Sequence, residues 1–154
     1  MKLVKKLMES IREYKTASIL TPVYVTVEVI MEVLIPFVMA SLIDKGIEAG
    51  SMSVIWKYGI ILLVLAMIAL AFGSMAGHQA SIASCGLAQN LRKDMYYRIQ
   101  NFSFSNIDKF STASIVTRLT TDVTNVQNAY QMLIRVAVRA PIMMIFAMIM
   151  SFTI

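Results

Sequence analysis

The sequence has a single cysteine and a single histidine, Cys85 and His78, among its 154 residues. One cysteine excludes an internal disulfide and does not identify the compartment. Cys85, His78 and the nearby Met75 are soft ligands on one predicted helix, but they form no complete set of metal ligands. The one histidine lies in an apolar run, so no serine–histidine–aspartate or cysteine–histidine arrangement can be built. We therefore predict no catalytic residue and no metal site.

Phosphate-binding glycine motifs are also missing. No G-x-x-x-x-G-K-[ST] pattern occurs, and no glycine-rich turn stands between a strand and a helix. We therefore expect that the chain is not an enzyme, that it binds no cofactor, and that it does not hydrolyse ATP by itself.

Charge is scarce as well, at 15% of residues, while 58% are hydrophobic and the mean hydropathy is +0.69. These values exclude an ordinary soluble domain. The runs 16–43 and 58–91 are each long enough to cross a bilayer as helices, which takes about 20 residues. A third run, 140–154, is shorter than a crossing, so we expect the sequence to be cut inside its third span. The sequence predicts an all-α membrane protein.

The cations are distributed unevenly around these runs. Twelve of the fourteen lysines and arginines either precede the first run or lie between the second and third, and Arg135 and Arg139 belong to the second group. The positive-inside rule places that side, with the N-terminus, in the cytoplasm of a multi-pass cell-membrane protein. This topology accounts for the net charge of +5, so no nucleic-acid partner is expected.

Residues 1–15 precede the first span. Their apolar residues recur at helical spacing opposite charged ones, which predicts an interfacial elbow helix, although a basic leader without a helix would also serve. These apolar residues are Leu3, Leu7, Ile11 and Tyr14.

The first span, about 16–43, carries Glu28 and Glu32 one helical turn apart. Carboxylates in hydrocarbon are costly and should face protein or a wet cavity. Two interpretations remain open: a cavity that favours cationic or polar cargo, or hydrogen bonds that fix helix packing. Pro36 predicts a kink, and Gly46 a helix end.

The second span is predicted to be one helix over about 56–102, because no proline occurs between Phe37 and Ala140. Such a helix would be about 70 Å long, against a hydrocarbon core of about 30 Å. Gly73 and Gly77 form a GxxxG pair, which predicts close packing against another helix.

A polar stretch, 94–127, separates the second and third runs. Its first part continues the long helix, residues 103–114 are rich in turn formers, and helical spacing resumes at Ile115. We expect a helical hairpin with a short membrane-parallel segment at its tip. Arg118 is spaced to pair with Asp122.

The segment FSTASIVTRLTTDVTNVQN, preceded by LRKDMYYRIQNFSFSNID, resembles the first intracellular loop of exporter-type (type IV, multidrug-like) ABC transporters. The segment EVIMEVLIPFVMASLIDKGI resembles the end of that family's first span. The order of these parts also agrees with the family over nearly the whole chain. Residues 16–154 then form part of a transmembrane domain, with a coupling loop at about 103–117 and the third span at about 118–154.

The resemblance implies an ATP-driven exporter whose first coupling helix docks on nucleotide-binding domains that carry ATP and Mg²⁺. Arg118 and Asp122 would brace the loop, although Ala113 and Ser114 stand where many members have glycine. Other implied partners are the lipid bilayer, a second transporter half (identical or different) and a small-molecule or peptide cargo. The coupling helix would comprise Thr112, Ala113, Ser114, Ile115, Val116 and Thr117.

Two other classes remain open. A small membrane scaffold protein would pair through Gly73 and Gly77 and transport nothing, and a sensor would relay a signal through the hairpin.

Overall fold

The computed structural model describes residues 9–101 and 112–153. These residues form helices joined by short turns, and no strand occurs among them. Three helices are long and apolar enough to cross a membrane: 12–47, 52–100 and 113–149. The prediction of an all-α membrane protein is confirmed.

Helix α2 extends from Lys15 to Leu42 and follows a single 3₁₀ turn, η1, at Arg12–Tyr14. It contains Pro22 and Pro36 and continues through both, so the helix does not end at Pro36. Proline removes one backbone donor, and neighbouring hydroxyls often restore the lost hydrogen bonding in membrane helices. The carbonyl that loses its donor to Pro22 is that of Ser18, four residues earlier. Near it, Thr26 Oγ1 donates to the carbonyl of Pro22, at 2.8 Å.

The connection between α2 and the next helix is a short π-helical turn, η2, at Ile43–Ile47. Gly46 lies inside this turn, and a Cβ there would be 3.0 Å from the side chain of Ile55. The left-handed residue that ends the connection is Gly50, with φ +63°. The sequence predicted that Gly46 ends the helix, and this prediction was wrong. Gly46 permits the close approach of Ile55 and does not have a positive φ, whereas Gly50 does.

Helix α3 extends from Met52 to Gln100 without interruption, a length of 49 residues. At the usual rise it measures about 74 Å, more than twice the thickness of a bilayer core. The structure therefore contains the long helix that the absence of proline predicted, although it begins four residues earlier than expected.

The last part of the chain is also one continuous helical segment. It comprises α5 (Thr112–Thr117), a π-helical turn η3 (Arg118–Asp122) and α6 (Val123–Thr153). The torsions at Thr117 and Val123 are helical, so α5 passes directly into η3 and α6. Within the described residues, α5 is thus the beginning of the ascending helix. The rest of the predicted hairpin tip lies outside the described residues.

The chain divides into two compact units. Unit 1 comprises residues 1–19 and 79–134, and unit 2 comprises residues 20–78 and 135–154. In unit 1, alanines of α2 and α3 pack with a side chain of α6, and the cluster consists of Ala17, Ala80, Ala83 and Ile134 with Tyr130 beside them. Small side chains let helix backbones approach closely, which is how membrane helices commonly associate.

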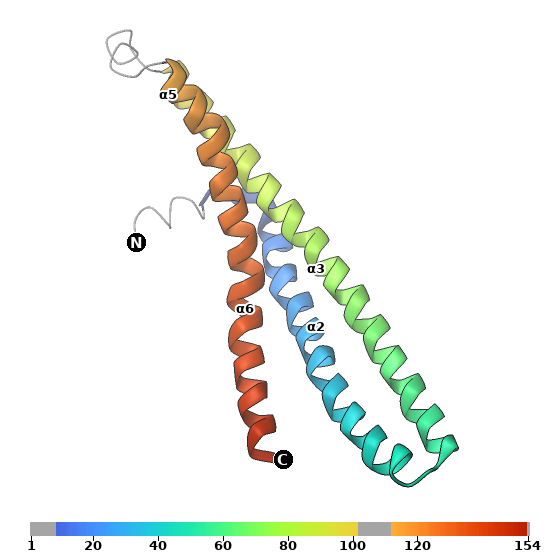
Figure 1. The fold of residues 1–154 in the computed structure, drawn as a ribbon. Coiled ribbons are helices and arrows are strands. Elements are labelled where there is room, and N and C mark those ends of the chain that lie inside the picture. The colour runs from blue at the N-terminus through green and yellow to red at the C-terminus, as the bar shows by residue number, and fades with distance from the viewer. Residues whose placement is uncertain (1–8, 102–111, 154) are drawn as a thin grey trace. The chain divides into compact units, whose positions relative to one another are not determined.

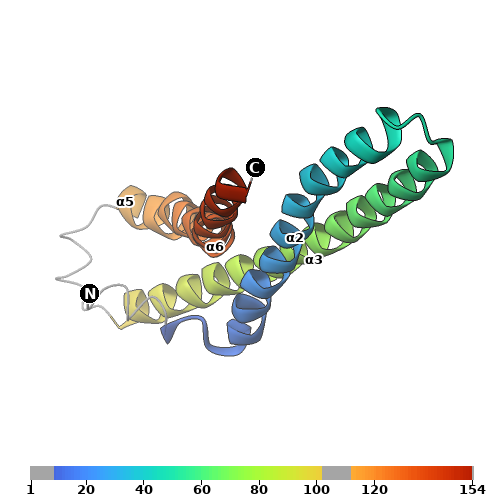
Figure 2. The same cartoon turned by 90° about the horizontal axis from the view of Figure 1, so that it is seen from below.

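In unit 2, α2 and the first part of α3 run side by side in opposite directions (Figures 1 and 2). Val25, Val29 and Ala76 are almost completely buried between them, and Val138 and Ile142 of α6 pack against this cluster. The rings of Tyr24 and Phe72 lie 6.0 Å apart between centroids. A second small core therefore joins all three helices within this unit.

Many large apolar residues of the long helices are exposed. Leu63, Leu70 and Leu133 each expose more than 60% of their surface, and only 6–11% of the most apolar stretch of each helix is buried inside the chain. Apolar patches of this extent are unusual on a soluble monomer and are the surface that lipid or partner helices cover. The chain is therefore a multi-pass membrane protein.

Gly86 of α3 permits the segment before α2 to approach α3 closely. The ring of Tyr14 lies over Gly86, and a Cβ at Gly86 would overlap the ring. The Tyr14 hydroxyl reaches Gln89 Oε1 at 3.5 Å. An aromatic ring is rigid and cannot bend away from an added Cβ, so only glycine fits at position 86.

We predict that Gly86→Ala lowers the free energy of unfolding by about 1–3 kcal/mol, the usual cost of overpacking. Gly59→Ala is the matched control, since a Cβ there meets no neighbouring atom within 4 Å in the part of the chain that the structure describes. In the control the better helix propensity of alanine should stabilise the helix by up to about 1 kcal/mol. Thermal unfolding in detergent, followed by circular dichroism, measures both variants. Equal shifts in the two variants would contradict the contact.

Candidate functional site

Three charged side chains from two helices meet in unit 2. Arg139 of α6 contacts Glu28 and Glu32, which lie one turn apart on α2. Arg139 Nη2 donates to both carboxylate oxygens of Glu32, each at 2.8 Å, and Nη1 donates to Glu28 Oε1 at 3.2 Å. We call these three residues the ion cluster.

The two carboxylates of the ion cluster differ in burial. Glu28 is 8% exposed, and Gly73 of α3 faces it so closely that an added Cβ would be 2.9 Å from Glu28 Oε1. The second oxygen, Glu28 Oε2, is buried and has no hydrogen-bond partner among the described residues. The side chain of Glu32 is 31% exposed and that of Arg139 is 39% exposed. Glu28 is thus the inner carboxylate and Glu32 the outer one.

The ion cluster lowers the cost of placing carboxylates on apolar helices, because it pairs them with a guanidinium. A carboxylate in hydrocarbon is costly unless it is paired, and a planar guanidinium can hold two acceptors at once. Two carboxylates (−2) and one guanidinium (+1) leave a formal charge of −1. The outer face of the cluster therefore cannot lie against lipid tails without a large cost, and protein or water must cover it.

The sequence did not reveal this pairing. It grouped Arg139 with the cations outside the membrane, whereas the structure brings Arg139 against two glutamates of the first span. The partners are 111 and 107 positions apart in the chain, so no local spacing connects them. The available signal was that Arg139 directly precedes the third apolar run. The predicted role of Glu28 and Glu32 in a cavity stays a prediction.

A cavity of about 510 Å³ opens beside the ion cluster in unit 2. Its lining comes from α2 and α6 and consists of Glu32, Val33, Pro36, Met143, Met144 and Ala147. The volume lies within the range of small-molecule sites, which are mostly apolar with a few polar groups. Glu32 is the one charged side chain of this lining.

The two glycines of the GxxxG pair have different surroundings in unit 2. Gly73 faces Glu28, while a Cβ at Gly77 would meet no neighbouring atom of the described residues within 4 Å. Of the two glycines, Gly73 is therefore the one that permits a close contact among the described residues.

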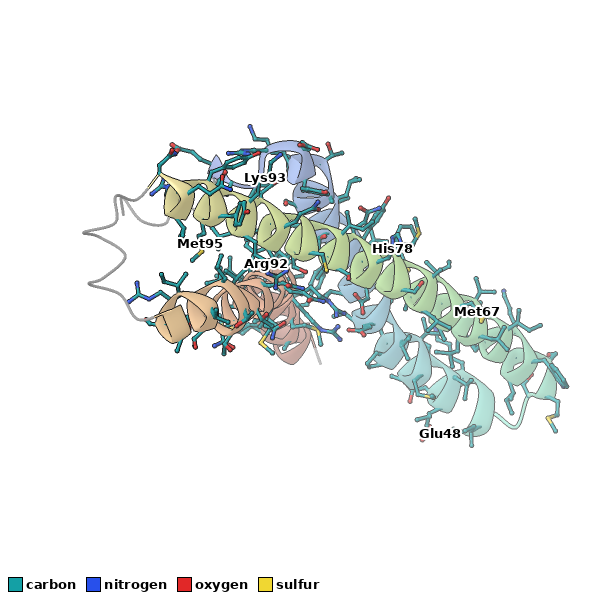
Figure 3. All side chains as sticks on the ribbon, turned by 90° about the horizontal axis from the view of Figure 1, so that it is seen from above. Glu48, Met67, His78, Arg92, Lys93 and Met95 are labelled. Carbon is teal, nitrogen blue, oxygen red and sulfur yellow. The ribbon has the colours of Figure 1, made fainter. Side chains whose placement is uncertain are left out.

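In unit 1, Arg92 joins α3 to the π-helical turn η3. Its Nε donates to the carbonyl of Leu119 and its Nη2 to Thr124 Oγ1, both at 3.3 Å. Figure 3 shows Arg92 on the side of α3 that faces α5 and the start of α6, and Lys93 on another side. A π turn interrupts the regular ladder of backbone bonds, and Arg92 supplies a donor there. Arg118 and Asp122 stand at the two ends of η3, and their bracing role stays a prediction.

The segment before α2 is fixed to α3 in unit 1 by polar contacts. Asn90 Nδ2 donates to the carbonyl of Ser10 at 2.9 Å, and Arg12 pairs with Asp94 at 2.8 Å. Arg12 itself has φ +39°, a conformation that non-glycine residues adopt at a cost of about 1–3 kcal/mol. A sharp turn therefore separates residues 9–11 from α2. Residues 1–8 of the predicted elbow helix lie outside the described residues.

We predict that Arg139→Gln destabilises the protein by about 3 kcal/mol, the lower end of the cost of breaking a buried ion pair, because Arg139 is partly exposed. The substitution leaves two like charges side by side in apolar surroundings. Arg135→Gln removes the same charge one turn earlier on α6 and should cost much less. The triple change Arg139→Gln, Glu28→Gln and Glu32→Gln should recover most of the loss. Thermal unfolding in detergent measures these differences, and no recovery would contradict the pairing.

Comparison with known proteins agrees with this architecture. The family model of the ABC transporter transmembrane region matches residues 19–154. A Bacillus subtilis (strain 168) protein named as an uncharacterized ABC transporter ATP-binding protein is 30% identical over 148 residues, which cover 96% of this chain and 26% of that protein. A similarly named protein of Mycobacterium tuberculosis (strain H37Rv) is 27% identical over 149 residues, covering 97% of this chain and 26% of that protein.

An ATP-dependent lipid A-core flippase of Albidiferax ferrireducens is 24% identical over 127 residues, which cover 82% of this chain and 22% of the flippase. The chain thus spans about a quarter of the length of the relatives it matches. The match to the family model extends over most of the chain and includes all of the ion cluster. The chain therefore belongs to the family of ABC transporter transmembrane regions, and its predicted resemblance to the exporter type is confirmed.

Proposed function

We propose that the chain is part of the transmembrane domain of an ATP-driven ABC exporter and carries movement from nucleotide-binding domains to a substrate pathway in the membrane. The length of α3 supports this proposal most strongly. Its 49 residues measure about 74 Å, so well over half of the helix must stand outside a hydrocarbon core of about 30 Å. A rigid helix of this length is suited to transmit force over that distance.

The cation distribution gives the proposed direction of that projection. Ten of the fourteen lysines and arginines lie in residues 1–15 or 92–118, and the positive-inside rule assigns this side to the cytoplasm. The turn between α2 and α3, with Gly50, then lies outside the cell. The polar end of α3 meets the nucleotide-binding domains on the cytoplasmic side.

In this proposal the coupling segment is 112–117, within the loop 103–117. Val116 exposes 53% of its surface, and such an exposed apolar side chain is suited to dock in a pocket of a partner. Because α5 continues into η3 and α6, a displacement of α5 is passed along the same helix. Arg92 ties this helix to α3, so both helices of unit 1 move together.

The other components of the transporter follow from the same proposal. ATP and Mg²⁺ belong to the nucleotide-binding domains, and a second half, identical or different, completes the transmembrane pathway. The exposed apolar faces of the long helices provide surface for both lipid and that second half. Glu28 and Glu32 line the pathway, and Arg118 and Asp122 brace the loop.

We predict that a cysteine at position 116 cross-links to a nucleotide-binding domain. Val116→Cys is introduced after Cys85→Ser has removed the native thiol, and membranes are treated with a bifunctional maleimide. The product should contain a polypeptide with a phosphate-loop motif, identified by mass spectrometry, and its yield should change when ATP is added.

The matched control is Met52→Cys, an apolar residue with 72% exposure at the other end of α3. It should give no such product, and on intact cells it alone should react with a membrane-impermeant maleimide. Cross-linking from both positions would exclude the proposed orientation. A product that contains only a second copy of the chain would instead support the scaffold function.

A further inference from the structure

We propose that a polar cavity between the segment before α2 and the end of α3 binds a phospholipid headgroup that carries both a phosphate and a primary ammonium, as in phosphatidylethanolamine. The cavity has a volume of about 350 Å³, and its lining consists of Glu9, Ser10, Arg12, Asp94, Tyr97 and Arg98. All of these residues belong to unit 1. The site shares no residue with the proposed substrate pathway, and the inference goes beyond the proposed function.

The wall formed by the segment before α2 is held in place by the chain itself. Asp94 accepts hydrogen bonds from Arg12 at 2.8 Å and from Ser10 at 3.4 Å. Asn90 donates to the carbonyl of Ser10, and these two residues are each only 8% exposed. The backbone of Arg12 has φ +39°, and strain of this kind gathers at ligand sites, where the surrounding structure maintains it. The cavity is therefore formed before any ligand binds.

Two opposite charges of the lining remain unpaired. Arg12 and Asp94 neutralise each other. Glu9 and Arg98 line the same cavity but form no salt bridge or hydrogen bond with each other or with any other described residue. A ligand with one anionic and one cationic group would pair both of them, whereas a ligand with a single charge would leave one unpaired. The lining therefore favours a zwitterionic ligand.

The donors of the lining favour a phosphate as the anionic group. The guanidinium of Arg98 is planar and presents several N–H groups in a geometry that matches phosphate oxygens. Arg12 uses Nη2 for Asp94, and its side chain is 49% exposed, so its other N–H groups remain accessible. Tyr97, which is 54% exposed, adds a hydroxyl. A phosphate in this cavity would meet two guanidinium groups and one phenol.

The carboxylate of Glu9 favours a primary ammonium as the cationic group. An ionised carboxylate accepts hydrogen bonds and donates none, and Glu9 is exposed. The ammonium of ethanolamine has three N–H donors, like that of a lysine, whereas the quaternary ammonium of choline has no donor and a glycerol headgroup has no positive charge. Glu9 therefore distinguishes ethanolamine from the other two headgroups.

The cavity lies where the uncharged runs of both helices end. Residues 16–27 and 58–91 contain no formally charged side chain. Arg12 lies four positions before the first of these runs, and Asp94 lies three positions after the second. Charged side chains at such a boundary reach the headgroup layer of a bilayer, and long arginine side chains do so most readily. We therefore place the cavity at the level of the headgroups.

The surroundings of the cavity favour a lipid over a soluble compound with the same groups. Tyr96 and Tyr97 each expose more than half of their surface, and tyrosines are enriched at membrane interfaces. The two helices that begin or end at the cavity also expose apolar side chains, such as Ile19 of α2 and Ile82 of α3. Acyl chains can lie along these side chains while the headgroup occupies the cavity.

The test compares phosphatidylethanolamine, phosphatidylcholine and phosphatidylglycerol with identical acyl chains. The protein is purified in detergent and titrated with each lipid, and bound lipid is measured by native mass spectrometry. Phosphatidylethanolamine should bind about tenfold more tightly than the other two, because each of them lacks the charged hydrogen bond to Glu9. Equal affinities for the three lipids, or tighter binding of phosphatidylglycerol, would overturn the proposal.

Soluble phosphoethanolamine distinguishes a lipid from a free compound with the same groups. Added at the same concentration as the lipid, it should not displace bound phosphatidylethanolamine, because it lacks acyl chains. Displacement would show that the cavity takes a soluble phosphate–ammonium compound, and it would overturn the assignment to a lipid.

Two substitutions separate the two ends of the headgroup. Glu9→Gln should remove the preference for phosphatidylethanolamine over phosphatidylglycerol, because it removes the partner of the ammonium. Arg98→Gln should weaken binding of all three lipids by about tenfold, because all three carry the phosphate. A preference that survives in Glu9→Gln, or unchanged affinities in Arg98→Gln, would overturn the assignment of that residue and with it the proposed site.

The matched controls are Glu13→Gln and Lys93→Gln, which remove the same charges from exposed residues nearby that do not line the cavity. Both should keep the affinities and the lipid preference of the original chain, and the same losses in the controls would overturn the site. The comparison of three lipids uses the unaltered chain, so it decides the proposal even if a variant fails to fold. These measurements need no ATP and no nucleotide-binding domain, so their failure is distinct from failure of the cross-link at Val116.

Discussion

The pairing of Arg139 with Glu28 and Glu32 is the interaction that most constrains the membrane part of this chain. Charged groups in apolar helices must be neutralised and kept from hydrocarbon, and one guanidinium holds both carboxylates. The pairing therefore fixes which sides of α2 and α6 meet in unit 2. It also determines which face lipid cannot cover, since Glu32 and Arg139 are each about a third exposed.

Small residues of α3 make the contacts of both units feasible. In unit 2, Gly73 leaves room for the buried carboxylate of Glu28, and in unit 1, Gly86 leaves room for the ring of Tyr14. Ala76 and Ala80 are completely buried in the cores of units 2 and 1 respectively. Dispersion and hydrogen bonding both depend on close approach of the helices. Short side chains permit that approach and so stabilise the packing of membrane helices, as large apolar side chains stabilise soluble cores.

The polar contacts of unit 1 have a different purpose. Arg92 reaches a π turn in which backbone bonding is irregular, and Asn90 and Asp94 hold the turn before α2. These groups lie on α3 within a few residues of each other. In the proposed exporter, the unit near the nucleotide-binding domains is therefore held by directional hydrogen bonds, whereas the cores of both units depend on close apolar packing.

The sequence by itself determined the class of this protein, the three apolar helices and the length of α3. Hydropathy and the absence of proline are local properties, and in a bilayer every backbone group must be satisfied within its own helix. The order of the motifs also indicated the transporter family. Only the tertiary structure decided that Arg139 belongs with Glu28 and Glu32, that Gly86 accommodates Tyr14, and that Gly50 rather than Gly46 takes the left-handed conformation. Such contacts join residues far apart in the chain or depend on the path of the backbone, and no local pattern specifies either.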